Sequence, residues 1–381
     1  MKKVLRLIAT SLLLSMVITY CIQPVAFAMQ DSADQVESDI NQDEVANDAS
    51  DNEELPDAEE IPYIPMFSLS NDLKSAFITP SVDFYKTVGQ DSAITEDELI
   101  KLFDYLSSIE LSTVIINTVH DGKGYYNTDI NQSTNDDILS IAINQARKSG
   151  FEVFLTLDIG NMLSRAKENY DIAMKVDLLA SQVHAFATKY KVEGIVATGY
   201  YASNRNIAYS DYMQSGAGIG IRNWRIDNSE YLIKTVADVI RRTDNSIAVG
   251  MMASHMWANS ADTKGGSDTN DDFTALKNGY ADTKKYITDK TVDFVILEAR
   301  GSISDGDIPF EKVAKWWTSL CNDNDTPLYI AHSNQKLGTS GWAQDQIIRQ
   351  LSIARKLDGY KGSAFLSTSA LKKNVGGSTD A

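Results

Sequence analysis

The sequence predicts a (β/α)8 barrel, and three observations support this prediction. Short apolar runs rich in β-branched residues alternate with longer amphipathic runs between Ala76 and Ser367. Eight short runs occur, one about every 41 residues, which suits one strand–helix unit with its loops. The first run leads into Pro80 and Ser81, without the glycine-rich phosphate loop that usually follows the first strand of a doubly wound open sheet. Eight units within about 250 to 400 residues are typical of a closed barrel.

Hydrophobic spacing locates the individual elements. Strands are expected at residues 76–83, 113–118, 152–158, 194–200, 247–253, 292–298, 327–332 and 363–367. The first helix opens at Thr95, a cap-type residue followed by acids that favour a helix N-terminus. Further helices are expected at residues 136–148, 170–190, 230–242, 272–289, 310–322 and 343–357. The barrel is therefore expected to occupy residues 63–374, with a flexible tail at 375–381.

The N-terminus predicts an exported protein. Lys2, Lys3 and Arg6 precede a short apolar run, and Ala26-Phe27-Ala28 fits a cleavage site, so residues 1–28 are predicted to be a signal peptide. The alternative is an uncleaved anchor, for which the apolar run is short. We therefore expect a secreted protein, extracellular or associated with the cell wall. No other apolar run approaches the length of a membrane span, so none is expected after cleavage.

Residues 29–62 are predicted to be a disordered acidic linker. This segment has 13 Asp and Glu residues and no Lys or Arg. Such a composition cannot bury enough apolar area to offset the entropy of ordering. The first 28 residues contribute three positive charges, so the net charge of −17 leaves −7 for residues 63–381. A mildly acidic barrel lacks the basic footprint of a nucleic-acid-binding protein, so no nucleic-acid partner is expected.

Cysteine and histidine usage indicates neither a disulfide nor a metal site. Cys321 is the one cysteine after the predicted signal peptide, and it follows an apolar helix, which favours a buried structural thiol. The four histidines fall in separate segments without metal-ligand spacing. We expect no metal and no cofactor.

Polar residues at the ends of the predicted strands form the candidate site, because sites in this architecture lie at the C-terminal strand ends. Carboxylates, amides and aromatic rings at these ends suit a sugar ligand. Glycoside cleavage requires two carboxyl groups roughly 5 to 10 Å apart. Asp158 and Glu298 end the third and sixth strands and are the best predicted catalytic pair. Further candidate substrate-binding residues at strand ends are Asn117, Tyr200, Arg300 and His332.

Each of these residues also has a structural interpretation. Asp158 could cap the next helix, since Ile159-Gly160-Asn161 follows it. Glu298 could form an ion pair with Arg300. His332 could be a hydrogen-bonded core residue, and Trp316 and Trp317 are expected to pack in the core.

Several segments carry a family resemblance. The run from Val249 to Asn259 is similar to the motif G-v-S-P-x-g-i-W-x-N, the run from Tyr280 to Tyr286 to Y-a-D-t-r-k-W, and Trp316-Trp317 to W-W. Together they resemble the glycosyl-hydrolase-like 10 domains, glycosylhydrolase-type proteins of bacterial envelopes. The resemblance implies a barrel that acts on or binds peptidoglycan or another polysaccharide. It also implies binding roles for Tyr200, Tyr201, Trp257 and Asn259.

The chain departs from this family at the end of the fourth predicted strand. The family motif G-I-x-f-D-D-Y-F-Y has two aspartates where this chain has Thr198 and Gly199. Neither residue can donate a proton to a leaving oxygen or form a glycosyl ester. Two hypotheses therefore remain open: a glycoside hydrolase that uses Asp158 and Glu298, and a non-catalytic barrel that binds glycan or another envelope protein.

Overall fold

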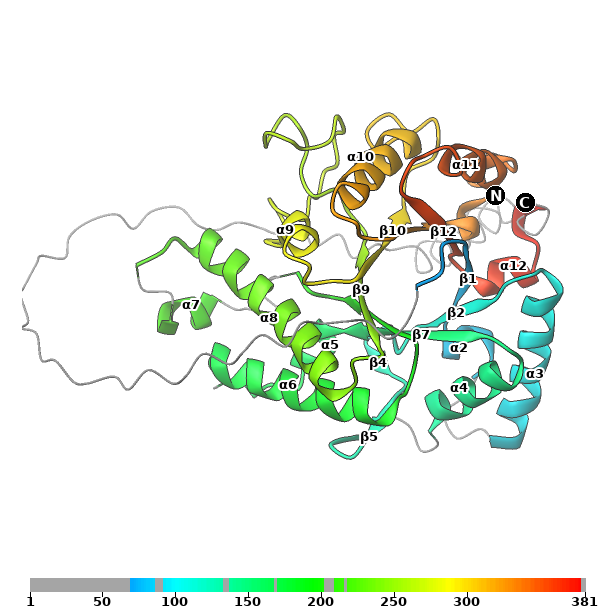
Figure 1. Ribbon diagram of the computed structural model, residues 1–381, viewed down its shortest axis with the longest axis horizontal. Helices are drawn as coiled ribbons and strands as arrows, with labels where there is room; N and C mark the ends of the chain where they lie inside the picture. The colour runs from blue at the N-terminus through cyan, green and yellow to red at the C-terminus, as the bar shows by residue number, and fades with distance from the viewer. Residues whose placement is uncertain are drawn as a thin grey trace, which may run out of the picture. The chain divides into compact units, whose positions relative to one another are not determined.

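The computed structural model describes residues 69–85, 92–132, 137–167, 170–201, 209–215 and 218–377, all within one compact unit, Ile61–Ala381 (Figure 1). The predicted signal peptide and acidic linker lie outside the described residues. Of the predicted tail, Val375–Gly377 forms a 3-10 helix, η2, and Val375 packs against a small apolar cluster of Leu337, Trp342, Ile347 and Leu351.

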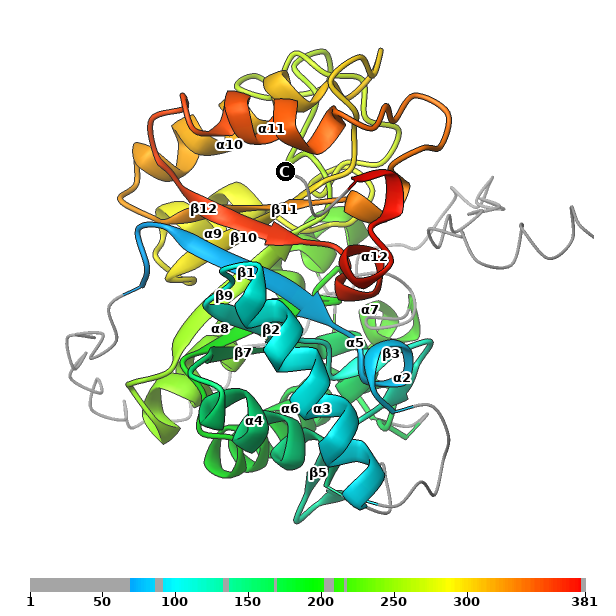
Figure 2. The same ribbon diagram turned by 90° about the vertical axis from the view of Figure 1, so that its right-hand side faces the viewer.

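A closed barrel of eight parallel strands forms the centre of this unit, which confirms the predicted fold class. Its strands are β1 (Leu73–Ile78), β2 (Thr113–Ile116), β7 (Glu152–Asp158), β8 (Gly194–Thr198), β9 (Ala248–Ala253), β10 (Phe294–Ala299), β11 (Leu328–His332) and β12 (Tyr360–Phe365). Their order around the barrel follows the order in the chain. Strand β1 pairs with both β12 and β2, and these pairings close the barrel (Figure 2).

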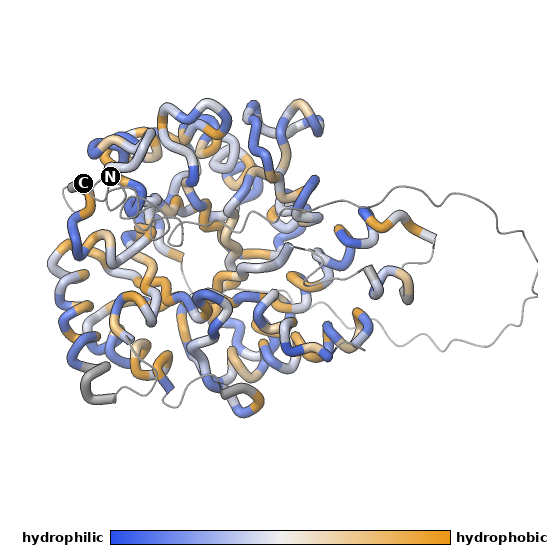
Figure 3. Tube along the Cα trace, turned by 180° about the vertical axis from the view of Figure 1, so that it is seen from behind, coloured by the Kyte–Doolittle hydropathy of each residue, from blue (hydrophilic) through white to orange (hydrophobic). Residues whose placement is uncertain are grey.

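The remaining elements are helices and short hairpin strands in the segments between and after the barrel strands. The helices are α2 (Pro80–Asp83), α3 (Ser92–Ser108), α4 (Ile138–Lys148), α5 (Ile159–Leu163), α6 (Ile172–Lys189), α7 (Tyr209–Ser215), α8 (Ile221–Thr243), α9 (Thr283–Thr288), α10 (Phe310–Asn322), α11 (Gln346–Ala354) and α12 (Thr368–Lys372), with the 3-10 helix η1 (Asn334–Lys336). Two small hairpins follow β2: β3 (Val119–His120) with β4 (Lys123–Gly124), and β5 (Asn127–Thr128) with β6 (Asn131–Gln132). In Figure 3 the outer helices carry both hydrophobic and hydrophilic residues, as expected of helices that cover a barrel with one face.

Several predicted boundaries were wrong; helix α8, expected at residues 230–242, begins nine residues earlier, at Ile221. Strand β1 ends at Ile78 and not at Asp83, because Pro80 begins a short helix at its first position. The helix expected at residues 272–289 is limited to α9. The residues before it form a loop, in which the side chains of Asn259, Asp271 and Asn278 bond to backbone groups.

Apolar side chains fill the barrel lumen, and every barrel strand contributes to this inner core. Its buried members are Leu73, Phe77, Ile115, Phe154, Val196, Ala248, Phe294, Ile296, Tyr329, Ala331 and Ala364. Gly250 leaves space for one of them, because a Cβ there would lie 2.3 Å from the ring of Phe294. A larger core between strands and helices contains Trp317 and Cys321, both fully buried as predicted. Burial raises the pKa of the Cys321 thiol to about 12.

None of the helices in the described residues is both long and apolar enough to cross a membrane.

Asp83, at the end of α2, is a buried carboxyl group with an unusual pKa. Its side chain is 4% exposed, and its Oδ2 accepts the backbone N–H of Thr79 at 2.7 Å. Burial raises the pKa of Asp83 to about 6, against the opposing effects of that hydrogen bond and of Lys372 and Lys373. The charged form of Asp83 is therefore disfavoured in the folded protein.

We predict that Asp83 makes folding stability fall as pH rises from about 4 to 6. In this interval the unfolded chain has released a proton that the folded chain still holds, which costs about 3 kcal/mol by pH 6.5. Asp83→Asn removes this titration, so its stability relative to the wild type should increase by up to that amount between pH 4 and 6.5. Denaturant unfolding of both proteins at the two pH values measures the difference. An identical pH dependence of the two proteins would contradict the prediction.

Candidate functional site

The candidate site is the mouth of the barrel, at the C-terminal ends of its parallel strands. Side chains along a strand alternate between the lumen and the helices. On β10, Phe294 and Ile296 belong to the inner core, so Glu298 is the next lumen-side residue. On β7, Phe154 belongs to the inner core, so Asp158, four residues later, is also on the lumen side. Both acids of the predicted pair thus lie on the lumen side of their strands, and their contacts decide what they can do.

Asp158 is the N-cap residue of α5. Its Oδ1 accepts the backbone N–H of Asn161 at 2.9 Å, which confirms the capping interpretation. The end of β8 closes against the same carboxylate: a Cβ at Gly199 would lie 2.3 Å from Oδ1 of Asp158. Gly199 also has a φ of +62°, which favours glycine. The carboxylate of Asp158 is therefore held by α5 and enclosed on one side by Gly199.

Glu298 is in a different position. In the described part of the chain, no group forms a hydrogen bond or an ion pair with its carboxylate. Its charge nevertheless acts on two neighbours, the phenol of Tyr201 and the ammonium of Lys336. Glu298 is thus a half-buried carboxylate at the mouth whose oxygens remain available to a ligand.

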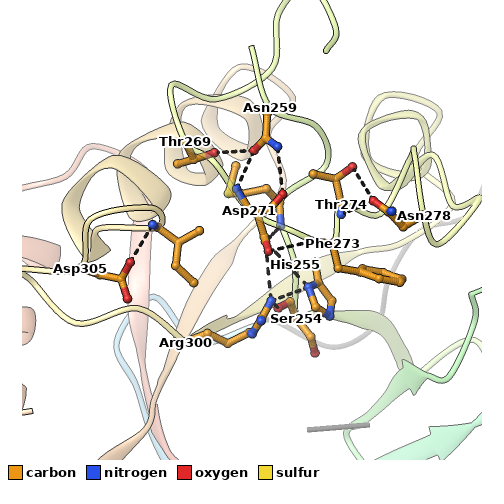
Figure 4. A network of polar contacts seen from close by, with 12 residues as sticks. Ser254, His255, Asn259, Thr269, Asp271, Phe273, Thr274, Asn278, Arg300 and Asp305 are labelled. Atoms are coloured by element: carbon orange, nitrogen blue, oxygen red, sulfur yellow. Dashed lines mark hydrogen bonds and ion pairs between the residues drawn. The ribbon is translucent and has the colours of Figure 1, made fainter. Parts of the chain in front are cut away.

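Arg300 does not pair with Glu298, contrary to the structural alternative raised from the sequence. Its Nη1 lies 3.6 Å from Oδ2 of Asp271 and donates hydrogen bonds to the carbonyl oxygen of Ser254, at 3.0 Å, and to Nδ1 of His255 (Figure 4). Because a guanidinium nitrogen can only donate, Nδ1 of His255 is the acceptor, and the proton of the neutral ring is on Nε2. Arg300 therefore fixes both the loop after β9 and the tautomer of His255.

Asp271 is the anchor of this network. Asn259 holds its backbone from both sides: Oδ1 accepts the N–H of Asp271 at 2.9 Å, and Nδ2 donates to its carbonyl oxygen at 2.9 Å (Figure 4). The Asp271 carboxylate accepts the backbone N–H of Met256 at 3.2 Å. Burial acts to raise its pKa, but the charge of Arg300 and the hydrogen bond from Met256 act against burial, and the pKa of Asp271 lies below its usual range.

Three rings of half-buried residues adjoin this network. Phe273 and His255 have ring centroids 4.6 Å apart, and Tyr201 meets both edge-on, at 5.8 and 6.0 Å. Burial raises the pKa of the Tyr201 phenol, and the charge of Glu298 raises it further. The structure thus brings together three of the predicted site residues, Tyr201, Glu298 and Arg300.

The remaining predicted residues make contacts within the fold. Buried Tyr200 donates to the carbonyl oxygen of Met252, and Asn117 donates to the hydroxyl of Thr79. Trp257 stacks on Trp316 with ring centroids 6.1 Å apart, and its Nε1 donates to Asp282. His332 is fully buried between Gln350 and Ser363, and burial lowers its pKa to about 4. These contacts agree with the interpretation of His332 as a hydrogen-bonded core residue.

Sequence reasoning missed Asp271 and Lys336 as members of the site. Asp271 directly precedes residues that were expected to form a helix but lie in a loop, and Lys336 is in η1, four residues after the predicted end of the seventh strand. The polar run Thr269 to Asp272 was a usable signal for a loop. Among the described residues there is no cluster of three or more His, Cys, Asp or Glu side chains suited to a metal ion.

Comparison with known proteins shows a similarity of this barrel to one family. Residues 169–348 match the family model Glycosyl hydrolase-like 10. This confirms the resemblance seen in the sequence motifs. The chain is 25% identical to glycosyl hydrolase YngK of Bacillus subtilis over 215 residues, which cover 54% of this chain and 42% of that protein. It is 26% identical to glycosyl hydrolase DigH of Escherichia coli over 169 residues, 42% of this chain and 38% of that protein. The chain thus spans less than half the length of these relatives.

Solved structures support the fold. Fpglu1 from Fervidobacterium pennivoraus superposes with a TM-score of 0.51 at 11% identity, covering 79% of this chain and 87% of that one. The α-L-fucosidase isoenzyme 2 from Paenibacillus thiaminolyticus superposes with a TM-score of 0.50 at 12% identity, covering 78% and 46%. At such low identity these similarities establish the barrel fold alone.

The family comparison gives Gly199 a particular meaning. The glycosyl hydrolase-like 10 motif noted above has an aspartate where this chain has Gly199. A side chain at position 199 would meet the Asp158 carboxylate and would need a positive φ. An acid at position 199 would require the Asp158 carboxylate to move, so the cap at Asp158 and the absence of the family's acid at position 199 agree with each other.

We predict that Asp158 can be replaced by Asn without loss of stability but not by Ala. Asn caps a helix about as well as Asp, whereas Ala removes the acceptor for Asn161 and should cost about 1 kcal/mol. Denaturant unfolding of Asp158→Asn and Asp158→Ala measures both effects. Equal stability of the Ala variant and the wild type would show that the cap contributes nothing.

Proposed function

We propose that this glycosyl hydrolase-like barrel binds a polysaccharide of the cell envelope or extracellular matrix at its mouth without cleaving it through a carboxylate pair. Cleavage by that route needs two carboxyl groups, one on each side of the scissile bond. The observation that carries the proposal is the placement of Asp158, which caps α5 and is enclosed by Gly199. Because Asp158 is engaged in this way, Glu298 has no second carboxylate of the predicted pair with which to cleave a glycosidic bond.

The mouth nevertheless offers the groups that sugars need. The Glu298 carboxylate can accept hydrogen bonds from hydroxyl groups, and Arg300 presents fixed donors beside it. Phe273 and Tyr201 are half-buried residues next to this network, and the phenol oxygen of Tyr201 is buried. Binding of peptidoglycan or another extracellular glycan agrees with the family match and with the predicted export signal. Binding outside the cytoplasm is part of the proposal.

Retained hydrolysis is the second candidate, because the unpaired Glu298 carboxylate at the mouth could still act as an acid or a base. Vestigial activity at the fourth-strand position is disfavoured, since loss of an essential carboxylate costs several powers of ten in rate. A third possibility, an envelope scaffold that binds protein, predicts no affinity for glycan.

One experiment separates these functions. The purified protein is incubated with purified peptidoglycan and with other envelope polysaccharides, and both bound protein and released reducing ends are measured. We predict binding without release, and about tenfold weaker binding in Glu298→Gln, equivalent to about 1.4 kcal/mol. Glu110→Gln makes the same chemical change at an exposed residue before β2, at the opposite end of the barrel, and should bind as the wild type does.

Each alternative has a distinct result. Release of reducing ends that is lost in Glu298→Gln would contradict the proposal and identify a hydrolase. Neither binding nor release would point to a protein partner.

A further inference from the structure

We propose that the mouth selects a sugar that carries a carboxylate, which Arg300 and Lys336 bind together while Glu298 accepts hydrogen bonds from neighbouring hydroxyls. This inference rests on the proposed glycan-binding function and adds the charge class of the ligand. The two cations come from neighbouring strand ends, since Arg300 follows β10 and Lys336 lies in η1 after β11. The ammonium of Lys336 donates to the backbone carbonyl oxygen of Arg300 at 2.9 Å.

The guanidinium of Arg300 is fixed but not saturated. Every hydrogen bond of its side chain to the described residues uses Nη1, which donates to Ser254 and His255. The side chain is 28% exposed, so solvent reaches it. An Arg side chain has five N–H donors in a rigid fork that matches a carboxylate. Arg300 is therefore a preorganised donor with capacity for a ligand.

The groups around Lys336 do not fully compensate its positive charge. Its ammonium lies 5.2 Å from the centroid of the Trp342 ring. Burial lowers the pKa of Lys336, Arg300 lowers it as well, and the opposing charges of Glu298 and Asp305 do not restore it. A bound anion would supply the missing compensation.

The acids around the two cations have other partners, apart from Glu298. Asp271 accepts the backbone N–H of Met256 besides its contact with Arg300. Asp305 accepts the backbone N–H groups of Asp307 and Ile308 at 3.0 and 2.8 Å. These two carboxylates hold loops, so the spare donors of Arg300 and Lys336 are left for a ligand. Arg300 keeps its ion pair with Asp271, but its remaining N–H donors and the ammonium of Lys336 can still bind a ligand carboxylate, whose charge neutral hydroxyls do not supply.

Monosaccharide probes test this inference independently of linkage and chain length. Binding of D-glucuronate, its methyl ester and D-glucose to the purified protein is measured by ligand-observed NMR titration at low ionic strength. We expect glucuronate to bind at least fivefold more tightly than the two neutral sugars, with the preference reduced by added salt. Lys336→Gln should lose at least fivefold in glucuronate affinity, and Lys336→Arg should retain most of it.

Lys361→Gln is the matched control, because Lys361 is the second residue of β12 and lies at the opposite end of the barrel. It should bind glucuronate as the wild type does. Equal affinity for glucuronate and glucose, or no difference between Lys336→Gln and Lys361→Gln, would overturn the inference. If a polysaccharide still binds in that case, the proposed function stands; if no sugar and no polysaccharide binds, both fail.

Discussion

The contact between the Asp158 carboxylate and the backbone of Gly199 is the constraint on which the chemistry of this barrel depends. It joins the ends of two neighbouring strands, β7 and β8, at the mouth. One oxygen of the carboxylate satisfies an N–H at the start of α5, a group that has no partner within its helix. The backbone at position 199 approaches so closely that only glycine fits without displacement. The carboxylate that caps α5 therefore lies beside position 199, where the related family motif has an aspartate.

The consequence is an asymmetric mouth. On the side of β7 and β8, the Asp158 carboxylate caps α5 and so stabilises the fold. On the side of β9, β10 and η1, the network of Asp271, His255 and Arg300 holds a loop, and Glu298 remains without a partner in the described part of the chain. Asn259 matches a binding position of the family motif. Its side chain here binds the N–H and the carbonyl oxygen of Asp271, so it holds the loop. This distribution suits recognition by one sector of the barrel better than cleavage between two opposed acids.

Hydrophobic periodicity was sufficient to predict the barrel because each buried strand is a short apolar run between polar turns. It could not predict contacts that depend on the path of a loop. Asp271 reaches Arg300 because a loop, and not a helix, precedes α9. Trp257 and His332 stand at motif or strand-end positions, but their rings point into packed regions, which a sequence pattern does not encode. The cap at Asp158 was open to prediction from the sequence that follows it, whereas its closeness to Gly199 required the pairing of β7 with β8.

A double-mutant cycle at positions 158 and 199 tests the central claim most directly. Free energies of unfolding are measured for the wild type, Asp158→Ala, Gly199→Ala and the double variant. If Gly199 is fitted against the Asp158 carboxylate, Gly199→Ala is costly in the wild type, and its cost falls by at least about 1 kcal/mol once the carboxylate is gone. The positive φ at position 199 leaves a residual cost in both backgrounds. Additivity of the two single substitutions within about 0.5 kcal/mol would contradict the account.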